Sequence, residues 1–135
     1  MPLVDEMKSS QHECDWSSPY SSLEAIDIED LVKDYNVVQI VASKRILRIR
    51  VGGFTFYLIG SGSYVHIVIP RIFCSCTDFS INVALRCSKR YCIHMAAVEL
   101  AERKGLYREA QLDPGEASEL ITTVLEAETT YRPIV

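Results

Sequence analysis

Apolar and polar side chains alternate every two residues through the middle of the chain. Leu47, Ile49 and Val51 fall on one side of an extended segment that begins at residue 45, and the side chains between them point the other way. Gly52 and Gly53 follow, and this pair indicates a two-residue hairpin turn because glycine accepts positive φ. The pattern predicts two antiparallel strands joined by this turn.

The alternation continues beyond the hairpin. Residues 54–59 form the returning strand, residues 60–63 a flexible glycine-serine turn, and residues 64–69 a third strand. Pro70 ends that strand because proline has no N–H to donate to a sheet. The sequence therefore predicts a three-stranded antiparallel meander.

A partial helical spacing of apolar side chains precedes the meander. Residues 23–35 carry the spacing, with an acidic outer face, and Ser21 or Ser22 can serve as N-cap. The apolar run 37–41 fits either an extension of this helix or a short strand, and the pattern does not decide between them.

Three helices are predicted after the meander. The first covers 78–86, begins at Thr77 as N-cap and buries Phe79 and Val83, with Ile81 as a further candidate. The second covers 92–104 and ends at Gly105. The third begins at Asp113-Pro-Gly-Glu, continues to about residue 130, and has an apolar face of Leu120, Ile121, Val124 and Leu125.

These elements predict a small α+β domain: a β-meander followed by short helices and flanked by an N-terminal and a C-terminal helix. For a chain of 135 residues we expect one compact domain with flanking parts. The expected divisions are a mobile acidic tail at 1–20, a helix and linker at 21–42, a central domain at 43–104 and a C-terminal helix at 105–135.

Charge is strongly segregated along the chain. Residues 1–42 have a net charge of −7, residues 43–104 a net charge of +7 and residues 105–135 a net charge of −4. A basic central region in an acidic protein is the kind of surface that meets phosphate or an acidic partner.

Cysteine usage and hydropathy indicate the compartment. The five cysteines are an odd number, which fits metal binding better than a disulfide framework. No apolar run approaches the roughly 18 residues of a membrane span, and the first residues lack the pattern of a signal peptide. We expect a cytoplasmic protein, or a nuclear one in a eukaryotic cell, where thiols stay reduced.

Two close pairs of metal-binding side chains carry the main chemical signal. Cys74-x-Cys76 follows the meander and Cys92-x-His94 opens the predicted helix 92–104, with 15 residues between the pairs. Three thiolates and one imidazole form the closed tetrahedral shell of a structural Zn²⁺ site. A helix N-terminus also favours thiolate over thiol at Cys92. The spacing therefore predicts one zinc ion that clamps the end of a sheet to the start of a helix.

Other cysteines and histidines compete for this role. Cys87 is a rival fourth ligand, but the pair Cys92 and His94 supplies two ligands from one helix start and is favoured. His12 and Cys14 form an isolated pair in the tail, where a solvated segment is the simpler interpretation. His66 lies in the middle of a strand, and a partly exposed sheet histidine is the default for it.

The pattern Cys-x-Cys, spacer, Cys-x-His after a meander resembles the SWIM-type zinc finger. Cys-Ser-Cys-Thr-Asp-Phe is similar to the usual Cys-Ser-Cys-Pro-Asp-Phe of that family, with Thr77 in place of proline. The resemblance covers about 54–104 and implies that Asp78 and Phe79 support the metal site. Residues 1–42 carry no motif that matches.

Ala97 extends the resemblance, because it follows His94 by three residues. Cys-x-His-x-x-Ala is typical of the small SWIM subunits of Shu-type complexes, which pair with RecA/RadA-like recombinase paralogues in homologous recombination. A small residue one turn from the ligand allows a neighbouring side chain to pack closely behind it.

The basic side chains of the central region are candidate nucleic-acid contacts, with Tyr57, Tyr64 or Tyr91 available for stacking on unpaired bases. The alternatives are an ordinary solvated surface, or a surface that meets the protein's own acidic helices or an acidic partner. The candidates are Arg45, Arg48, Arg50, Arg71, Lys89 and Arg90.

The combined hypothesis is a non-enzymatic zinc-binding adaptor in homologous recombination and DNA repair. Its partners would be a RecA/RadA-like paralogue and single-stranded DNA, with no membrane and no small-molecule substrate. The alternative is a zinc-dependent protein-interaction or transcription-type DNA-binding module outside recombination. No nucleophile–base pair, phosphate-binding glycine loop or pair of acids is evident, so we expect no enzymatic turnover.

Overall fold

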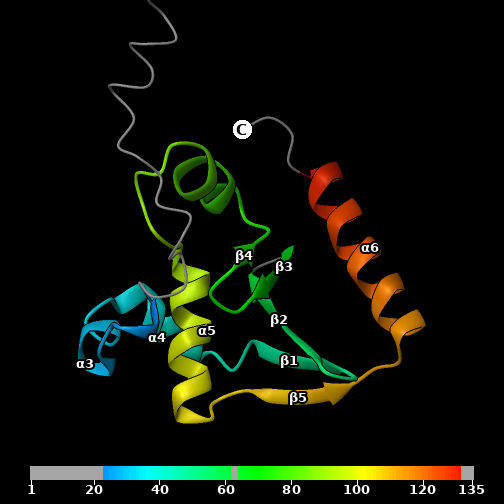
Figure 1. Ribbon diagram of the computed structural model, residues 1–135, viewed down its shortest axis with the longest axis horizontal. Coiled ribbons are helices and arrows are strands. Elements are labelled where there is room, and N and C mark those ends of the chain that lie inside the picture. Colours follow the sequence, from blue (N-terminus) through cyan, green and yellow to red (C-terminus); the bar gives the residue numbers. More distant parts are fainter. Residues whose placement is uncertain (1–22, 62–63, 132–135) are drawn as a thin grey trace, which may run out of the picture.

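The computed structural model describes residues 23–61 and 64–131, and it confirms a mixed α+β fold (Figure 1). The predicted meander is present as three antiparallel strands with a two-residue turn, in which Gly52 has a φ of 59°. The second strand is longer than predicted and takes up the first half of the expected glycine-serine turn. The strands are β1 (Ile46–Val51), β2 (Phe54–Ser61) and β3 (Tyr64–Ile69).

Two short strands that the sequence pattern did not predict widen the sheet. β4 (Phe73–Cys74) pairs antiparallel with β3, and β5 (Arg108–Gln111) pairs parallel with β1. The described sheet therefore has five strands in the order β4-β3-β2-β1-β5. β5 lies within residues 105–135, the segment predicted as a C-terminal helix. The division of the chain into domains remains a prediction.

The predicted helix over 23–35 is wrong. Residues 23–24 are helical, but the chain then turns at 25–27, forms a single turn, α3 (Ile28–Leu31), and starts a separate helix, α4 (Tyr35–Ala42). The break between α3 and α4 occurs because the Asp34 carboxylate accepts hydrogen bonds from the backbone N–H groups of Asn36 and Val37, at 2.9 and 3.4 Å, and so starts a new helix. The undecided run 37–41 is therefore helical, and Tyr35 is left exposed.

The helices after the meander are largely as predicted, with corrections at individual positions. The first of them is a π-helix. Its N-cap is Asp78 and not Thr77, which lies in the helical turn just before the π-helix. Ile81 is exposed and not buried. Leu125 likewise lies off the buried face of the last helix. The elements are η1 (Phe79–Leu85), α5 (Ile93–Lys104) and α6 (Pro114–Tyr131).

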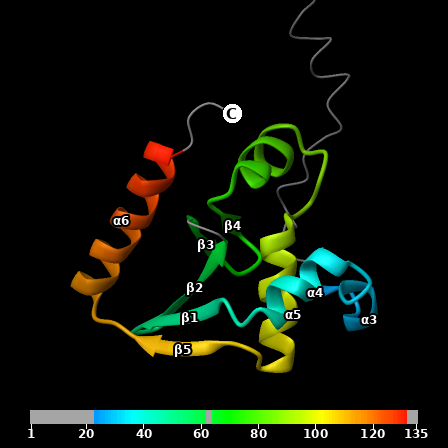
Figure 2. The same cartoon turned by 180° about the vertical axis from the view of Figure 1, so that it is seen from behind.

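The elements form layers on the two faces of the sheet. α5 covers one face, with α3 and α4 packed on its outer side, and α6 covers the other face (Figures 1 and 2). β2 is the central strand and is buried on both sides: Tyr57 and Ile59 face α5, whereas Phe56 and Leu58 face α6. The alternation in the sequence thus separates two cores.

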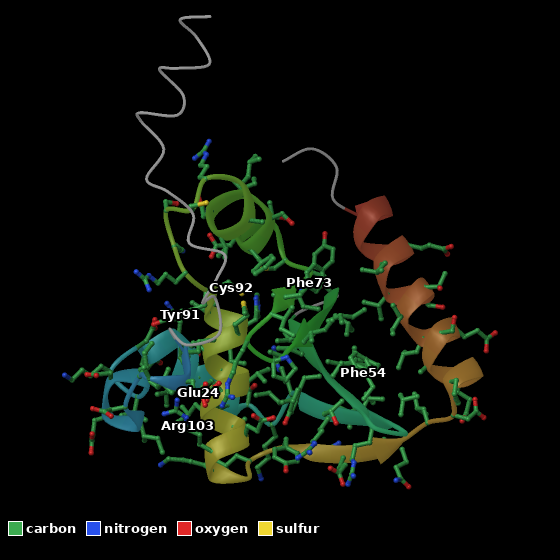
Figure 3. All side chains as sticks on the ribbon, in the orientation of Figure 1. Glu24, Phe54, Phe73, Tyr91, Cys92 and Arg103 are labelled. Carbon is green, nitrogen blue, oxygen red and sulfur yellow. The ribbon has the colours of Figure 1, made fainter. Side chains whose placement is uncertain are left out.

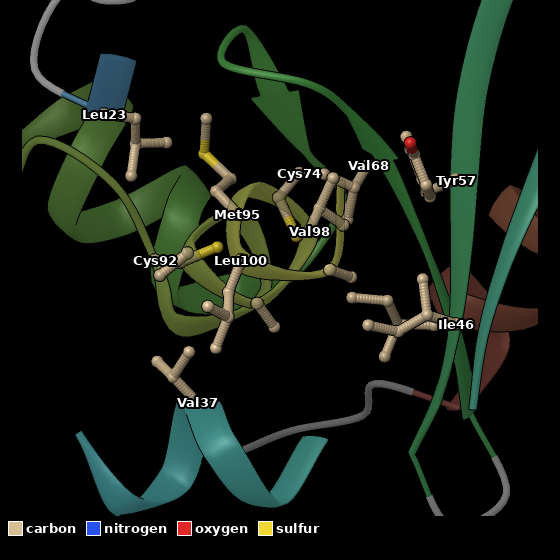
Figure 4. Close-up of a cluster of buried hydrophobic side chains, with 14 of the residues drawn as sticks. Leu23, Val37, Ile46, Tyr57, Val68, Cys74, Cys92, Met95, Val98 and Leu100 are labelled. Carbon is tan, nitrogen blue, oxygen red and sulfur yellow. The ribbon is translucent and has the colours of Figure 1, made fainter. Parts of the chain in front are cut away.

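The larger core lies between α4, α5 and the sheet, and the metal-binding cysteines are part of it. Figure 4 shows Cys74 and Cys92 beside Met95, Val98 and Leu100 of α5. All five side chains are at most 3% exposed. The candidate metal site is therefore continuous with the apolar interior.

A buried carboxylate joins α5 to two distant segments. The side chain of Glu99 is 1% exposed and accepts hydrogen bonds from Arg71, after β3, at 2.8 and 2.9 Å, and from Arg103 at 2.8 Å. Arg103, labelled in Figure 3, also donates to the backbone carbonyls of Leu23 and Ile26. Burial alone would raise the pKa of Glu99, but the hydrogen bonds from both arginines outweigh it and lower the pKa. Loss of both arginines would leave this buried carboxylate uncompensated, which costs about 3–5 kcal/mol.

None of the described helices has the length and apolar content needed to cross a membrane. The candidate ligands His12 and Cys14 and the candidate caps Ser21 and Ser22 lie outside the described residues.

Candidate metal centre

The four predicted ligands come together at one point. The ligand atoms of Cys74, Cys76, Cys92 and His94 all lie within 4.8 Å of one another, and the Sγ of Cys92 is 4.0 Å from the Nδ1 of His94. Ligands bound to one tetrahedral zinc ion at 2.0–2.3 Å lie about 4 Å apart. The set therefore fits Zn²⁺ in both donor chemistry and spacing, which confirms the predicted cofactor site.

The first pair of ligands is fixed by the edge of the sheet. Cys74 is the last residue of β4, and Ser75 continues the pairing with β3: its N–H donates to the Ile67 carbonyl, and its hydroxyl accepts from the Ile67 N–H, both at 2.9 Å. Because Ser75 is held between them, Cys74 and Cys76 are both directed into the buried site.

The second pair is fixed by the start of a helix. Cys92 is the N-cap of α5 with extended backbone angles, and its carbonyl accepts the Ala96 N–H at 3.1 Å. His94 lies in the first turn, where the helix dipole favours negative charge on a nearby thiolate. The metal would thus join the exit of β4 directly to the entrance of α5.

The pKa of each of the thiols Cys74 and Cys76 depends on the neighbouring thiols of the site. Hydrogen bonds with Cys76 and Cys92, together with burial, raise the pKa of Cys74, whereas hydrogen bonds from Cys74 and Cys92 lower the pKa of Cys76. One negative charge is therefore shared easily, but three would repel strongly in a buried site. A divalent cation that accepts all three thiolates removes this conflict.

Two residues that the sequence resemblance assigned to support of the site, Phe79 and Asp78, lie next to the ligands in sequence and make contacts there. The backbone N–H of Phe79 donates to the Sγ of Cys76 at 3.3 Å. The Asp78 carboxylate accepts from Asn82 at 2.7 Å and from Lys89 at 3.0 Å, which ties η1 to the loop that leads into Cys92. These contacts support both halves of the site.

Ala97 lies one turn after His94 and is completely buried. A larger side chain there would press on the core directly behind the ligand helix, which is consistent with the packing role predicted for it.

His66 is a neighbour of the site that sequence reasoning missed. Its ring centroid is 4.5 Å from that of His94, and the ring is half-buried. The alternation of β3 places His66 on the same strand face as Val68, which belongs to the core between the sheet and α5. His94 lies at the start of α5, so this alternation indicated that His66 faces the ligand helix.

Cys87 does not belong to the ligand cluster of the described residues. It lies in the loop between η1 and α5 with a φ of 54°. The positions of Cys92 and His94 beside Cys74 and Cys76 therefore support their choice as ligands over Cys87.

Three of the six cationic nucleic-acid candidates are engaged by other side chains of the protein. Arg48 donates to the Tyr107 hydroxyl and pairs with Glu109, Arg71 is held by Glu99, and Lys89 is held by Asp78. Lys89 is nevertheless exposed, as are Arg45, Arg50 and Arg90. Among the tyrosines proposed for stacking, Tyr57 is fully buried and donates to Glu102, so its ring is inaccessible to a base.

Comparison with known families agrees with the ligand geometry. Residues 60–102 match the SWIM zinc finger. This SWIM segment runs from the end of β2 to α5 and contains all four ligands. Comparisons with curated proteins and with solved structures gave no match.

The SWIM ligand assignment predicts opposite effects for two cysteine substitutions. Cys76→Ser removes a ligand and should abolish stoichiometric zinc, whereas Cys87→Ser should retain one zinc ion per chain. Metal content measured by mass spectrometry on the purified variants checks this. Retention of zinc by Cys76→Ser, or its loss in Cys87→Ser, would contradict the assignment.

Proposed function

We propose that the chain is a non-enzymatic zinc-built adaptor that acts with a RecA/RadA-like recombinase paralogue in homologous recombination and DNA repair. The observation that carries the proposal is the four-ligand centre within the SWIM segment, together with the small Ala97 three residues after His94. In the resemblance described above, this extended motif is typical of subunits that pair with such paralogues.

The proposal of an adaptor and not an enzyme rests on the ligand shell. Structural zinc sites have four protein ligands, whereas catalytic sites keep a position open for water or substrate. Four donors converge here, from a sheet edge and a helix start, and three of them are buried. The metal would then hold surfaces in place and take no part in chemical turnover.

Contact with single-stranded DNA is the second part of the proposal. Arg48, Arg71 and Lys89 have carboxylate partners, so the proposal concentrates on the exposed side chains Arg45 and Arg50 of the β1 region. Flexible exposed cations neutralise phosphates without sequence preference.

The alternative is a zinc-dependent protein-interaction or transcription-type DNA-binding module outside recombination. The observation that favours it is the extent of the family match, which covers the zinc finger and not the flanking segments.

Purification of the tagged chain from its native cell should distinguish these functions. We expect the full chain and Cys87→Ser to retain a RecA-like ATPase, and Cys76→Ser to lose it because the partner surface depends on the metal centre. Subunits would be identified by mass spectrometry. Recovery of a promoter-bound complex or an unrelated partner in place of the ATPase would favour the alternative.

Binding of single-stranded DNA should weaken as salt rises, with each lost phosphate contact lowering the slope of log K against log salt by about 0.7. The double substitution Arg45→Glu and Arg50→Glu should reduce both affinity and slope, whereas Lys33→Glu, on the acidic α3 side, should change neither. Fluorescence anisotropy of a labelled oligonucleotide measures this. Absent or salt-insensitive binding would contradict direct DNA contact.

A further inference from the structure

A hollow of about 340 Å³ lies away from the metal centre, where the ends of α4 and α5 meet the beginnings of β1 and β5. Its volume is within the range of about 300–1,000 Å³ that is usual for ligand sites. We name it the Leu106 hollow, and its lining residues are Val41, Ala42, Lys44, Ile46, Gly105, Leu106, Tyr107 and Arg108.

The floor of the Leu106 hollow is aliphatic. Val41 and Ile46 are 7% and 2% exposed, whereas Leu106 at the rim is 50% exposed. Gly105, with a φ of 67°, ends α5, and the Leu106 N–H donates to the Ala101 carbonyl at 2.9 Å. The backbone turn therefore holds a large apolar side chain at the mouth of an apolar hollow.

The rim of the Leu106 hollow is positively charged. Lys44 and Arg108 are exposed, and neither forms an ion pair with any described residue. The acids nearby in sequence are engaged elsewhere, since Glu109 pairs with Arg48 and Glu102 accepts from Tyr57. The hollow thus offers cations that no carboxylate of residues 23–61 or 64–126 pairs with, beside apolar walls.

Two helices end at the hollow, where unpaired carbonyls would attract cations. The N–H groups of Ser43, Lys44 and Leu106 donate to three of these carbonyls. The charged side chains of the lining, Lys44 and Arg108, are both cations. The charge complement of the Leu106 hollow is therefore an acidic group.

An unpaired nucleic-acid base also fits the hollow poorly. Stacking needs an open aromatic face. Tyr107 is the aromatic residue in the lining, and its ring already has the Arg48 guanidinium over it at 5.2 Å and makes an edge contact with Tyr57 at 5.9 Å between centroids. Aliphatic walls favour an apolar protein side chain.

We propose that the Leu106 hollow docks a segment of a partner protein in which a large apolar side chain is flanked by aspartate or glutamate. The apolar side chain enters between Ile46 and Leu106, and the flanking carboxylates meet Lys44 and Arg108. This inference rests on the proposed adaptor function and adds the chemistry of one partner surface.

The probe is a short synthetic peptide with leucines between runs of aspartate and glutamate, titrated into the zinc-loaded full chain with labelled methyl groups. We expect the methyl signals of Val41, Ile46 and Leu106 to shift with the acidic leucine peptide. Replacement of its leucines by alanine, or of its acids by lysine, should weaken binding about ten-fold or more. The proposal would be overturned if all the peptides bound equally, if the shifts were confined to another surface, or if no peptide bound. Displacement of the peptide from the hollow by a thymidine oligonucleotide would also overturn it.

Matched variants separate this surface from general apolar or charge effects. Leu106→Asp should weaken peptide binding about ten-fold, whereas Ile72→Asp, an exposed apolar position near the opposite sheet edge, should not. The double variant Lys44→Glu and Arg108→Glu should bind the lysine peptide more tightly than the acidic peptide. The control variant Arg86→Glu should keep the preference for the acidic peptide. An unchanged preference in the charge-reversed variant would overturn the proposal.

The metal content and spectra of each variant distinguish failure of the docking proposal from failure of the adaptor proposal. If zinc is retained, the signals stay dispersed and no peptide binds, the docking inference fails and the adaptor function stands. If the partner complex itself is absent from the native cell, the adaptor function fails independently of the peptide result.

Discussion

The link between the exit of β4 and the entrance of α5 is the constraint on which the rest of the fold depends. Cys74 and Cys76 come from the sheet edge, and Cys92 and His94 from the helix start. Structural zinc contributes about 10–16 kcal/mol of apparent binding energy in small fingers, as much as the whole stability of a typical domain. Thiols this close and this buried require a cation to be held together as thiolates.

The position of α5 determines where several distant segments lie. Through Glu99 the helix holds Arg71 after β3, and through Arg103 it holds the backbone before α3. Its C-terminal turn places Leu106 beside α4 and β1. A metal ion bound at one end of the helix would therefore set the geometry of the Leu106 hollow, the proposed docking surface, at the other end.

The sequence predicts the parts of this structure that follow from local chemistry. The ligand pairs, the hairpin at Gly52 and the end of α5 at Gly105 depend on side-chain type and spacing, and all three are present. β5 was not predicted because it is short and polar, and it exists only by pairing with β1. The break at Asp34 was missed because a capping carboxylate can also lie on the acidic face of a continuous helix. The contact of His66 with His94 is tertiary and needs the sheet and helix to be assembled.

The most direct test of this account is removal of the metal from the purified full chain. Circular dichroism and methyl spectra recorded during titration with a strong chelator should show coupled loss of sheet, helix and side-chain dispersion, restored by stoichiometric zinc. Metal-free protein that keeps the native spectra, or that binds no zinc on reconstitution, would contradict it.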